Sequence, residues 1–94
     1  MDSIIQKNTS RCFICHSRSN LEFHHVYGGS NRSISEKYGL KVRLCHNCHN
    51  EPPYGVHQNK ERREALQAFV QKKAMDHYGW SVEDFRDRFH KSYI

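Results

Sequence analysis

Two short segments of the chain alternate apolar and polar residues and are predicted to form β-strands. Residues 21–26 set β-favouring residues around two adjacent histidines, and residues 40–44 alternate leucine or valine with lysine and arginine. Alternation with a period of two is typical of a strand that has one buried face. Residues 27–39 contain glycines and one predicted helical turn, and would join the two strands as antiparallel partners.

The longest helix is predicted to cover about residues 60–78. Asn59 is placed to cap its N-terminus and Gly79 to end it. A short helical turn is predicted over residues 46–50. Pro52-Pro53 would stop that turn and bend the chain back, because the residue before a proline avoids the helical region.

A last helix is predicted to begin after Ser81 and to run to about residue 90. The spacing of Ser81 and Asp84 is that of a capping box. Apolar residues at helical spacing mark the faces that the two long helices should bury. These residues are Ala65, Leu66, Phe69, Val70 and Ala74 in the first helix, and Val82, Phe85 and Phe89 in the last.

Ninety-four residues, of which 36% are hydrophobic, make one small domain of the α+β class. Burial alone would leave such a domain marginally stable, so a covalent or metal staple is expected. Residues 1–11 are polar and unpatterned and are predicted to form a flexible arm. Residues 12–57 would form the stapled core, and residues 58–94 the C-terminal helices.

Four cysteines form two CxxC pairs, Cys12 with Cys15 and Cys45 with Cys48, separated by 29 residues. Each CxxC turn places two sulfurs close together, so the two pairs can supply the four ligands of a structural Zn²⁺ site. The chain has no pattern typical of a secretory signal or of a membrane span, which favours a reducing cytoplasm. Thiols there bind metal more readily than they form disulfides.

The formal net charge is +5 with histidines neutral, and the pI is about 9.2. A basic small domain favours a polyanionic partner, most simply nucleic acid, although an excess of basic residues also serves solubility. The basic residues expected to contact nucleic-acid phosphates are Arg32, Lys41, Arg43, Arg62 and Arg63.

Histidine is unusually frequent, with eight in the chain, and two are adjacent on the first predicted strand. Neighbouring side chains on a strand point to opposite faces, so His24 and His25 should serve different purposes. One imidazole can ligate a metal while the other faces a substrate. His49 follows the second CxxC pair directly, and His57 follows the Pro-Pro bend, so both are candidate ligands near the first strand.

This order of residues resembles the HNH nuclease family, which has the ββα-metal fold. That family has a strand carrying Asp-His or His-His, a loop, a second strand and a helix with metal ligands, and many members are braced by two CxxC pairs. The resemblance covers residues 12–57, and the flanks look like those of small phage-borne HNH proteins. It implies a ββα-metal core followed by C-terminal helices, in the cytoplasm of a bacterial or phage-infected cell.

Carried over residue by residue, the resemblance makes His24 the first metal ligand and His25 the general base. His49 matches the ligand at the head of the helix. In the colicin-type nucleases a second helical histidine follows four residues later, but Pro53 occupies that position here. His57 is therefore taken as the third ligand.

The family's middle Asn, which lies just before the second strand, has no counterpart, because residues 38–40 read Tyr-Gly-Leu. An asparagine elsewhere is expected to orient the ring of His25. The candidates are Asn31, Asn50 and Asn59.

The resemblance implies hydrolysis of phosphodiester bonds. A neutral imidazole, with an unperturbed pKa of about 6.5, suits a general base that activates water. One divalent ion would stabilise charge on the phosphate and on the leaving 3′-oxygen. Three imidazoles without a carboxylate suit Zn²⁺ or Ni²⁺, while family behaviour keeps Mg²⁺ and Mn²⁺ open.

The expected function is thus a metal-dependent endonuclease acting on DNA, most simply double-stranded DNA. A homodimer and a larger phage or DNA-processing partner are both open as assemblies. The rival interpretation is a non-catalytic zinc-knuckle module that binds nucleic acid or a protein. The doubled His24-His25 favours the enzyme, because a binding knuckle has no need of it.

Overall fold

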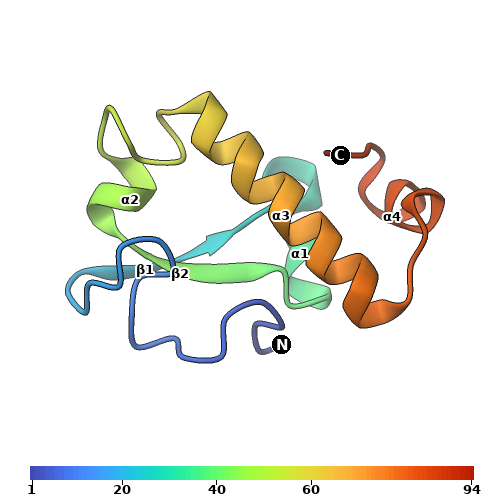
Figure 1. The fold of residues 1–94 in the computed structure, drawn as a ribbon, viewed down its shortest axis with the longest axis horizontal. Coiled ribbons are helices and arrows are strands. Elements are labelled where there is room, and N and C mark those ends of the chain that lie inside the picture. The colour runs from blue at the N-terminus through green and yellow to red at the C-terminus, as the bar shows by residue number, and fades with distance from the viewer.

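A two-stranded antiparallel sheet lies at the centre of the molecule (Figure 1). The computed structural model describes residues 1–94. Strand β1 (Leu21–His25) pairs with β2 (Lys41–Cys45), and the register sets His24 opposite Val42 and His25 opposite Lys41. The predicted antiparallel pair is confirmed, with strand ends that differ by one residue from the prediction.

The rest of this small α+β chain consists of helices and of loops without regular structure, the longest of which covers residues 1–20. In Figure 1, α3 runs diagonally across the sheet and α4 lies beyond its C-terminal end. No helix has the length and apolar character needed to cross a membrane. The helical elements are the 3₁₀ turn η1 (Gly29–Asn31), α1 (Arg32–Lys37), α2 (His46–Asn50), α3 (Lys60–Tyr78) and α4 (Val82–Phe89).

The predicted helix ends are confirmed by their capping contacts. The Asn59 side chain accepts a hydrogen bond from the Arg62 backbone N–H, and Gly79 ends α3 in the left-handed conformation, with φ of 69°. At α4 the Ser81 side chain accepts from the Asp84 N–H while the Asp84 carboxylate accepts from the Ser81 N–H. These reciprocal bonds satisfy donors that a helix start otherwise leaves unpaired.

One hydrophobic core joins one face of the sheet to the two long helices. β2 contributes Val42 and Leu44, and α3 contributes Leu66, Val70 and Ala74, all buried. An aromatic cluster formed by Tyr27, Phe85 and Phe89 extends the core towards α4.

The predicted apolar face of α3 is partly wrong, because Phe69 is 44% exposed and Ala65 is exposed as well. Gln71 is fully buried instead. Its side chain donates to Ser92 Oγ and accepts from the Tyr93 backbone N–H. A buried amide with both groups paired costs little, so α3 turns Gln71 rather than Phe69 towards the core.

Part of the N-terminal segment contacts β2, within residues 1–11, for which the sequence predicts a flexible or loosely docked arm. Gln6 is buried, and its Oε1 accepts from the Arg43 backbone N–H at 2.7 Å. The Ile4 N–H donates to the Gly39 carbonyl at 3.0 Å, and Ser3 Oγ donates to the Lys41 carbonyl. The segment thereby covers backbone groups along the outer edge of the sheet.

We predict that Gly39→Ala destabilises the chain. Gly39 has φ of 71°, and an added Cβ would collide with the backbone carbonyl of Asp2. The left-handed conformation alone costs a non-glycine residue about 1–2 kcal/mol, and displacement of the N-terminal segment adds to this. Chemical denaturation monitored by circular dichroism measures the loss.

Gly28→Ala is the matched control for this prediction. Gly28 has φ of −96°, and an added Cβ meets nothing within 4 Å. Its free energy of unfolding should stay within about 0.5 kcal/mol of the parent value. Equal stabilities of the two variants would contradict the docking of the N-terminal segment on Gly39.

Candidate functional site

Four thiols from two distant CxxC turns meet at one end of the sheet. The sulfurs of Cys12, Cys15, Cys45 and Cys48 all lie within 4.8 Å of one another, and the Cys15 and Cys45 sulfurs are 3.6 Å apart. Zn–S bonds of about 2.3 Å in a tetrahedron give sulfur separations of about 3.8 Å. The cluster is therefore compatible with the predicted structural zinc site.

Backbone hydrogen bonds shape the first turn and tie it to the sheet. The Cys12 N–H donates to the Ser17 carbonyl at 2.7 Å, and the Phe13 N–H donates to the Arg43 carbonyl at 2.8 Å. Burial raises the pKa of the Cys12 thiol, but backbone N–H groups aimed at its sulfur outweigh burial and bring the pKa down to about 7. Such N–H groups stabilise a thiolate, which is the form that binds metal.

A second cluster contains the three histidines that the sequence analysis predicted to be metal ligands. His24 comes from β1, His49 from α2, and His57 from the loop before α3, and their nearest ring nitrogens lie within 4.8 Å of one another. The Nε2 atoms of His49 and His57 are 3.0 Å apart. The bend at Pro52 places His57 there, because the His57 N–H donates to the His49 carbonyl at 3.1 Å.

The three imidazoles form a group that could hold a metal ion. His24 is 4% exposed, yet its buried Nε2 has no hydrogen-bond partner in the chain. A buried polar atom without a partner is costly unless a ligand satisfies it. Burial, followed by the neighbouring histidines, lowers the pKa of His24 to about 3, so its ring stays neutral, as a metal ligand must be.

A carboxylate that sequence reasoning missed contacts one ring of this histidine cluster. Glu22 Oε1 lies 2.8 Å from His49 Nδ1 and also accepts from the Asn50 amide. Metal-bound histidines commonly donate their second ring N–H to a carboxylate, which fixes the ring with its other nitrogen free. Glu22 stands two residues before His24, so the period of the strand already placed both on one face.

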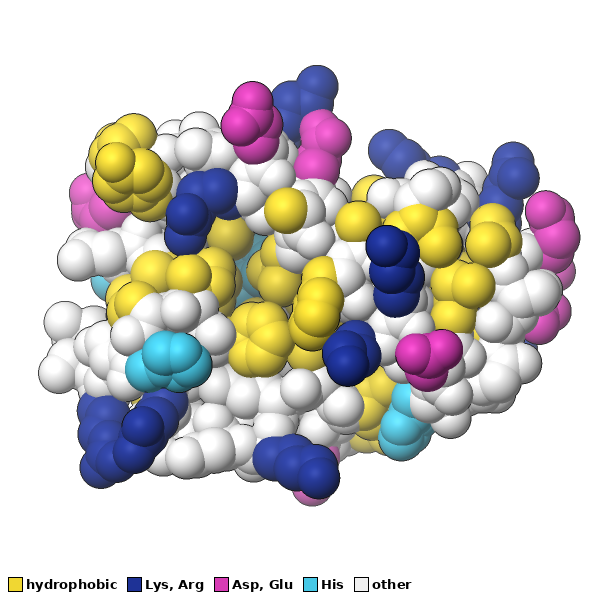
Figure 2. Space-filling view, in the orientation of Figure 1, with side chains coloured by type: hydrophobic (Ala, Val, Ile, Leu, Met, Phe, Trp, Pro, Cys, Tyr) yellow, Lys and Arg dark blue, Asp and Glu magenta, His cyan; other side chains and the backbone are white.

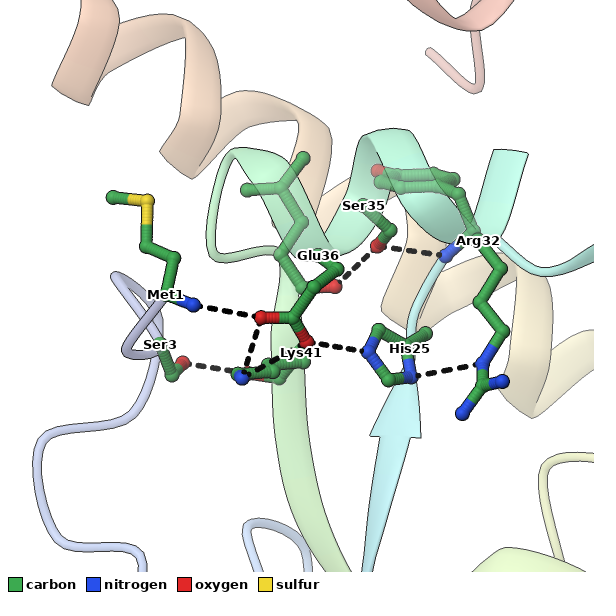
Figure 3. A network of polar contacts seen from close by, with 9 residues as sticks. Met1, Ser3, His25, Arg32, Ser35, Glu36 and Lys41 are labelled. Atoms are coloured by element: carbon green, nitrogen blue, oxygen red, sulfur yellow. Dashed lines mark hydrogen bonds and ion pairs between the residues drawn. The ribbon is translucent and has the colours of Figure 1, made fainter.

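His25 faces the opposite side of β1, as strand alternation predicted. Its Nε2 lies 2.8 Å from Glu36 Oε1, and Arg32 Nε donates to its Nδ1 at 3.4 Å. These contacts are drawn in Figure 3, where His25 lies between Glu36 and Arg32. The three side chains line a small polar pocket together with Gly29 and Ser33.

Glu36 is the second carboxylate that sequence reasoning missed. Lys41 Nζ lies 3.0 Å from both of its oxygens, and the Met1 amino group lies 2.8 Å from Oε2. Hydrogen bonds from the Met1 amino group, from His25 and from Lys41 hold the pKa of the Glu36 carboxyl well below its usual range. Glu36 is therefore an ionised acceptor.

None of the asparagines expected to orient His25 does so, and that hypothesis was wrong. Asn31 donates to the Phe89 carbonyl, Asn50 contacts Glu22, and Asn59 caps α3. Glu36 occupies the place beside the ring. Glu36 lies on α1, which belongs to the segment that connects β1 to β2 in the sequence. Only the path of this segment brings Glu36 to His25.

The five basic residues expected to bind phosphates are spread over the molecule. Arg32 lies beside His25, and Arg63 is close enough to contribute, after burial and His49, to lowering the pKa of His57. Lys41 also belongs to the surroundings of His25, because both contact Glu36. The other two are engaged elsewhere: the Arg43 guanidinium lies 4.1 Å from the centre of the Phe23 ring, and Arg62 lies over Tyr54.

Comparison of the chain with protein-family models, with curated proteins and with solved structures found no match. The functional assignment therefore depends on the two side-chain clusters and on the surroundings of His25.

We predict that Cys48→Ser removes a tightly held zinc ion and lowers the free energy of unfolding by about 3 kcal/mol or more. Metal binding to a site formed only in the folded state contributes directly to folding. Elemental analysis of dialysed protein and thermal unfolding measure the two effects. His16→Asn is the control, because His16 is exposed, directly follows the first CxxC pair and has φ of 66°, a conformation that Asn tolerates. An unchanged melting temperature for Cys48→Ser would show that the thiols hold no metal.

Proposed function

We propose that the chain is a metal-dependent endonuclease of the HNH type, which hydrolyses phosphodiester bonds in DNA. In this proposal β1, β2 and α2 form the ββα-metal core. One observation carries it: three imidazoles converge on one side of β1, while the adjacent His25 lies on the other side between a carboxylate and a guanidinium. A non-catalytic zinc knuckle would not need a separate histidine, held between a carboxylate and a guanidinium, on the side of β1 opposite the three imidazoles.

His24, His49 and His57 would hold the divalent ion, with Glu22 fixing the ring of His49. When bound, the ion would supply Lewis-acid stabilisation of charge on the phosphate and on the leaving oxygen. The four cysteines would hold a separate zinc ion, with a purely structural role.

His25 is the proposed general base. It takes a proton from a water molecule as the water oxygen forms a bond to phosphorus and the bond from phosphorus to the 3′-oxygen breaks. The proton on His25 then passes to solvent, and the 3′-oxygen takes a proton from water. His25 is not in the group of histidines that could hold the ion, so the ion would not occupy its ring nitrogens.

Arg32 and Arg63 are the proposed phosphate contacts. They lie near His25 and near His57 respectively, so they would hold the backbone on either side of the scissile bond. Guanidinium groups suit this task because their donors match two phosphate oxygens at once.

We predict that His25→Ala lowers the rate of plasmid nicking by about 10²–10⁴-fold, the usual contribution of a general base. Its metal content and DNA affinity should stay close to those of the parent. His24→Ala should instead lose the exchangeable ion while keeping the thiol-bound zinc. The assay is supercoiled-plasmid nicking with added Mg²⁺, Mn²⁺, Ni²⁺ or Zn²⁺.

His77→Ala, at an exposed position on α3, is the control and should nick like the parent. Parent-like nicking by His25→Ala would refute the assignment of the base. If the parent nicks with none of these ions, the nuclease proposal fails and the zinc-knuckle binding module takes its place.

We also predict that Arg63→Ala weakens DNA binding uniformly across sequences. Loss of one phosphate contact should reduce the slope of log K against log salt by about 1. Fluorescence anisotropy with a labelled duplex at several salt concentrations measures the slope. Arg86→Ala, on α4 and paired with Glu83, should leave it unchanged. An unchanged slope for Arg63→Ala would remove Arg63 from the interface.

A further inference from the structure

The two neighbours of His25 determine which ring nitrogen carries hydrogen. A carboxylate oxygen only accepts hydrogen bonds, and a guanidinium nitrogen only donates them. Glu36 Oε1 lies 2.8 Å from Nε2, so Nε2 must bear the hydrogen. Arg32 Nε lies 3.4 Å from Nδ1 and points its hydrogen at it, so Nδ1 must hold the lone pair. Both contacts specify the same neutral tautomer, and they do so independently.

We propose that Glu36 is the positioning residue of this site, and that it fixes His25 as the Nε2–H tautomer so that Nδ1 is the atom that accepts the proton. Arg32 covers Nδ1 until a substrate phosphate draws its guanidinium away. This inference rests on the proposed function for its catalytic consequence, but the tautomer itself is a property of the protein alone.

Glu36 is well placed to act in this way because its own position is fixed. Lys41 reaches both of its oxygens from β2, at 3.0 Å, and Lys41 stands directly opposite His25 in the strand register. Figure 3 shows the carboxylate between Lys41 and the imidazole. A carboxylate held from one side by an ammonium group has little freedom to rotate away from the ring on the other side.

The contact between Glu36 and His25 would also stabilise the positive charge that develops on His25 during the reaction. When Nδ1 takes the proton of water, His25 becomes an imidazolium with hydrogen on both nitrogens. The Glu36 carboxylate then faces a cation through the bond it already makes, which stabilises that state without any rearrangement. The proton leaves Nδ1 for solvent after cleavage, and the original tautomer returns.

The tautomer is tested directly by ¹⁵N NMR of the imidazole nitrogens in the zinc-loaded full chain. The ¹⁵N chemical shifts of the two ring nitrogens report which of them carries hydrogen. In the parent, His25 should show hydrogen on Nε2. Glu36→Ala should give a mixture of tautomers, while Glu36→Gln should keep the parent tautomer, because its amide oxygen still accepts from Nε2. Hydrogen on Nδ1 in the parent, or a parent-like spectrum for Glu36→Ala, would overturn the proposal.

Kinetics on DNA separate positioning from a structural role. Glu36→Ala should lower kcat by about 10–10³-fold while KM changes by less than about 3-fold, because in this proposal Glu36 acts through His25 and not on the substrate. Glu36→Gln, which keeps the tautomer and loses the charge, should fall between Glu36→Ala and the parent. Glu64→Gln, at an exposed ion pair on α3, is the control and should match the parent.

The two proposals fail in different ways. If the parent does not nick but His25 shows the Nε2–H tautomer, the nuclease assignment falls and the Glu36 assignment stands. If the parent nicks and Glu36→Ala keeps the parental kcat, the positioning role falls and the nuclease assignment stands. Should Glu36→Ala fail to fold, the ¹⁵N spectrum of the parent still tests the tautomer, and a parental kcat for Glu36→Gln would overturn the stabilisation of the imidazolium by the Glu36 charge.

Discussion

The register of β1 against β2 is the constraint on which both sides of the site depend. Because side chains alternate along a strand, a shift of one residue would send His24 to the solvent side and His25 into the core. The register is held at one end by the pairing of Leu21 with Cys45, beside the thiol cluster. At the other end the Val26 N–H donates to the Leu40 carbonyl at 3.1 Å.

One strand thus gives two adjacent histidines opposite environments, and each side of the sheet has its own carboxylate. On the core side His24 is buried with a free ring nitrogen, and Glu22 orients its neighbour His49. On the solvent side both nitrogens of His25 are engaged, by Glu36 and by Arg32. The first environment suits a metal ligand, which needs a neutral ring with a free lone pair. The second suits a base, which needs a defined acceptor nitrogen and a counter-charge.

The sequence predicted what local signals determine. The bounds of α3 and its caps at Asn59 and Gly79 followed from residue type and spacing, and both strands followed from alternation. Contacts between distant segments carried no such signal. Gln6 is polar and would be expected to be exposed to solvent, yet its side chain accepts a hydrogen bond from the Arg43 N–H on β2. Glu36 reaches His25 only because of the path of the segment that connects the two strands. Glu22 was within reach of prediction, because a strand with His24 inward must also turn Glu22 inward.

The thiol cluster and the imidazole cluster are linked through α2, because Cys48 and His49 are consecutive residues on a helix of only five residues. Two backbone hydrogen bonds extend this link to His57. The Val56 N–H donates to the Cys48 carbonyl, and the His57 N–H donates to the His49 carbonyl. Two of the three imidazoles therefore take their positions from the helix that the thiols anchor, whereas His24 and His25 take theirs from the sheet. Zinc at the thiols would accordingly set the distance between His49 and His24 without touching either ring. A helix this short has little stability of its own, so that distance can be held only by tertiary contacts of this kind.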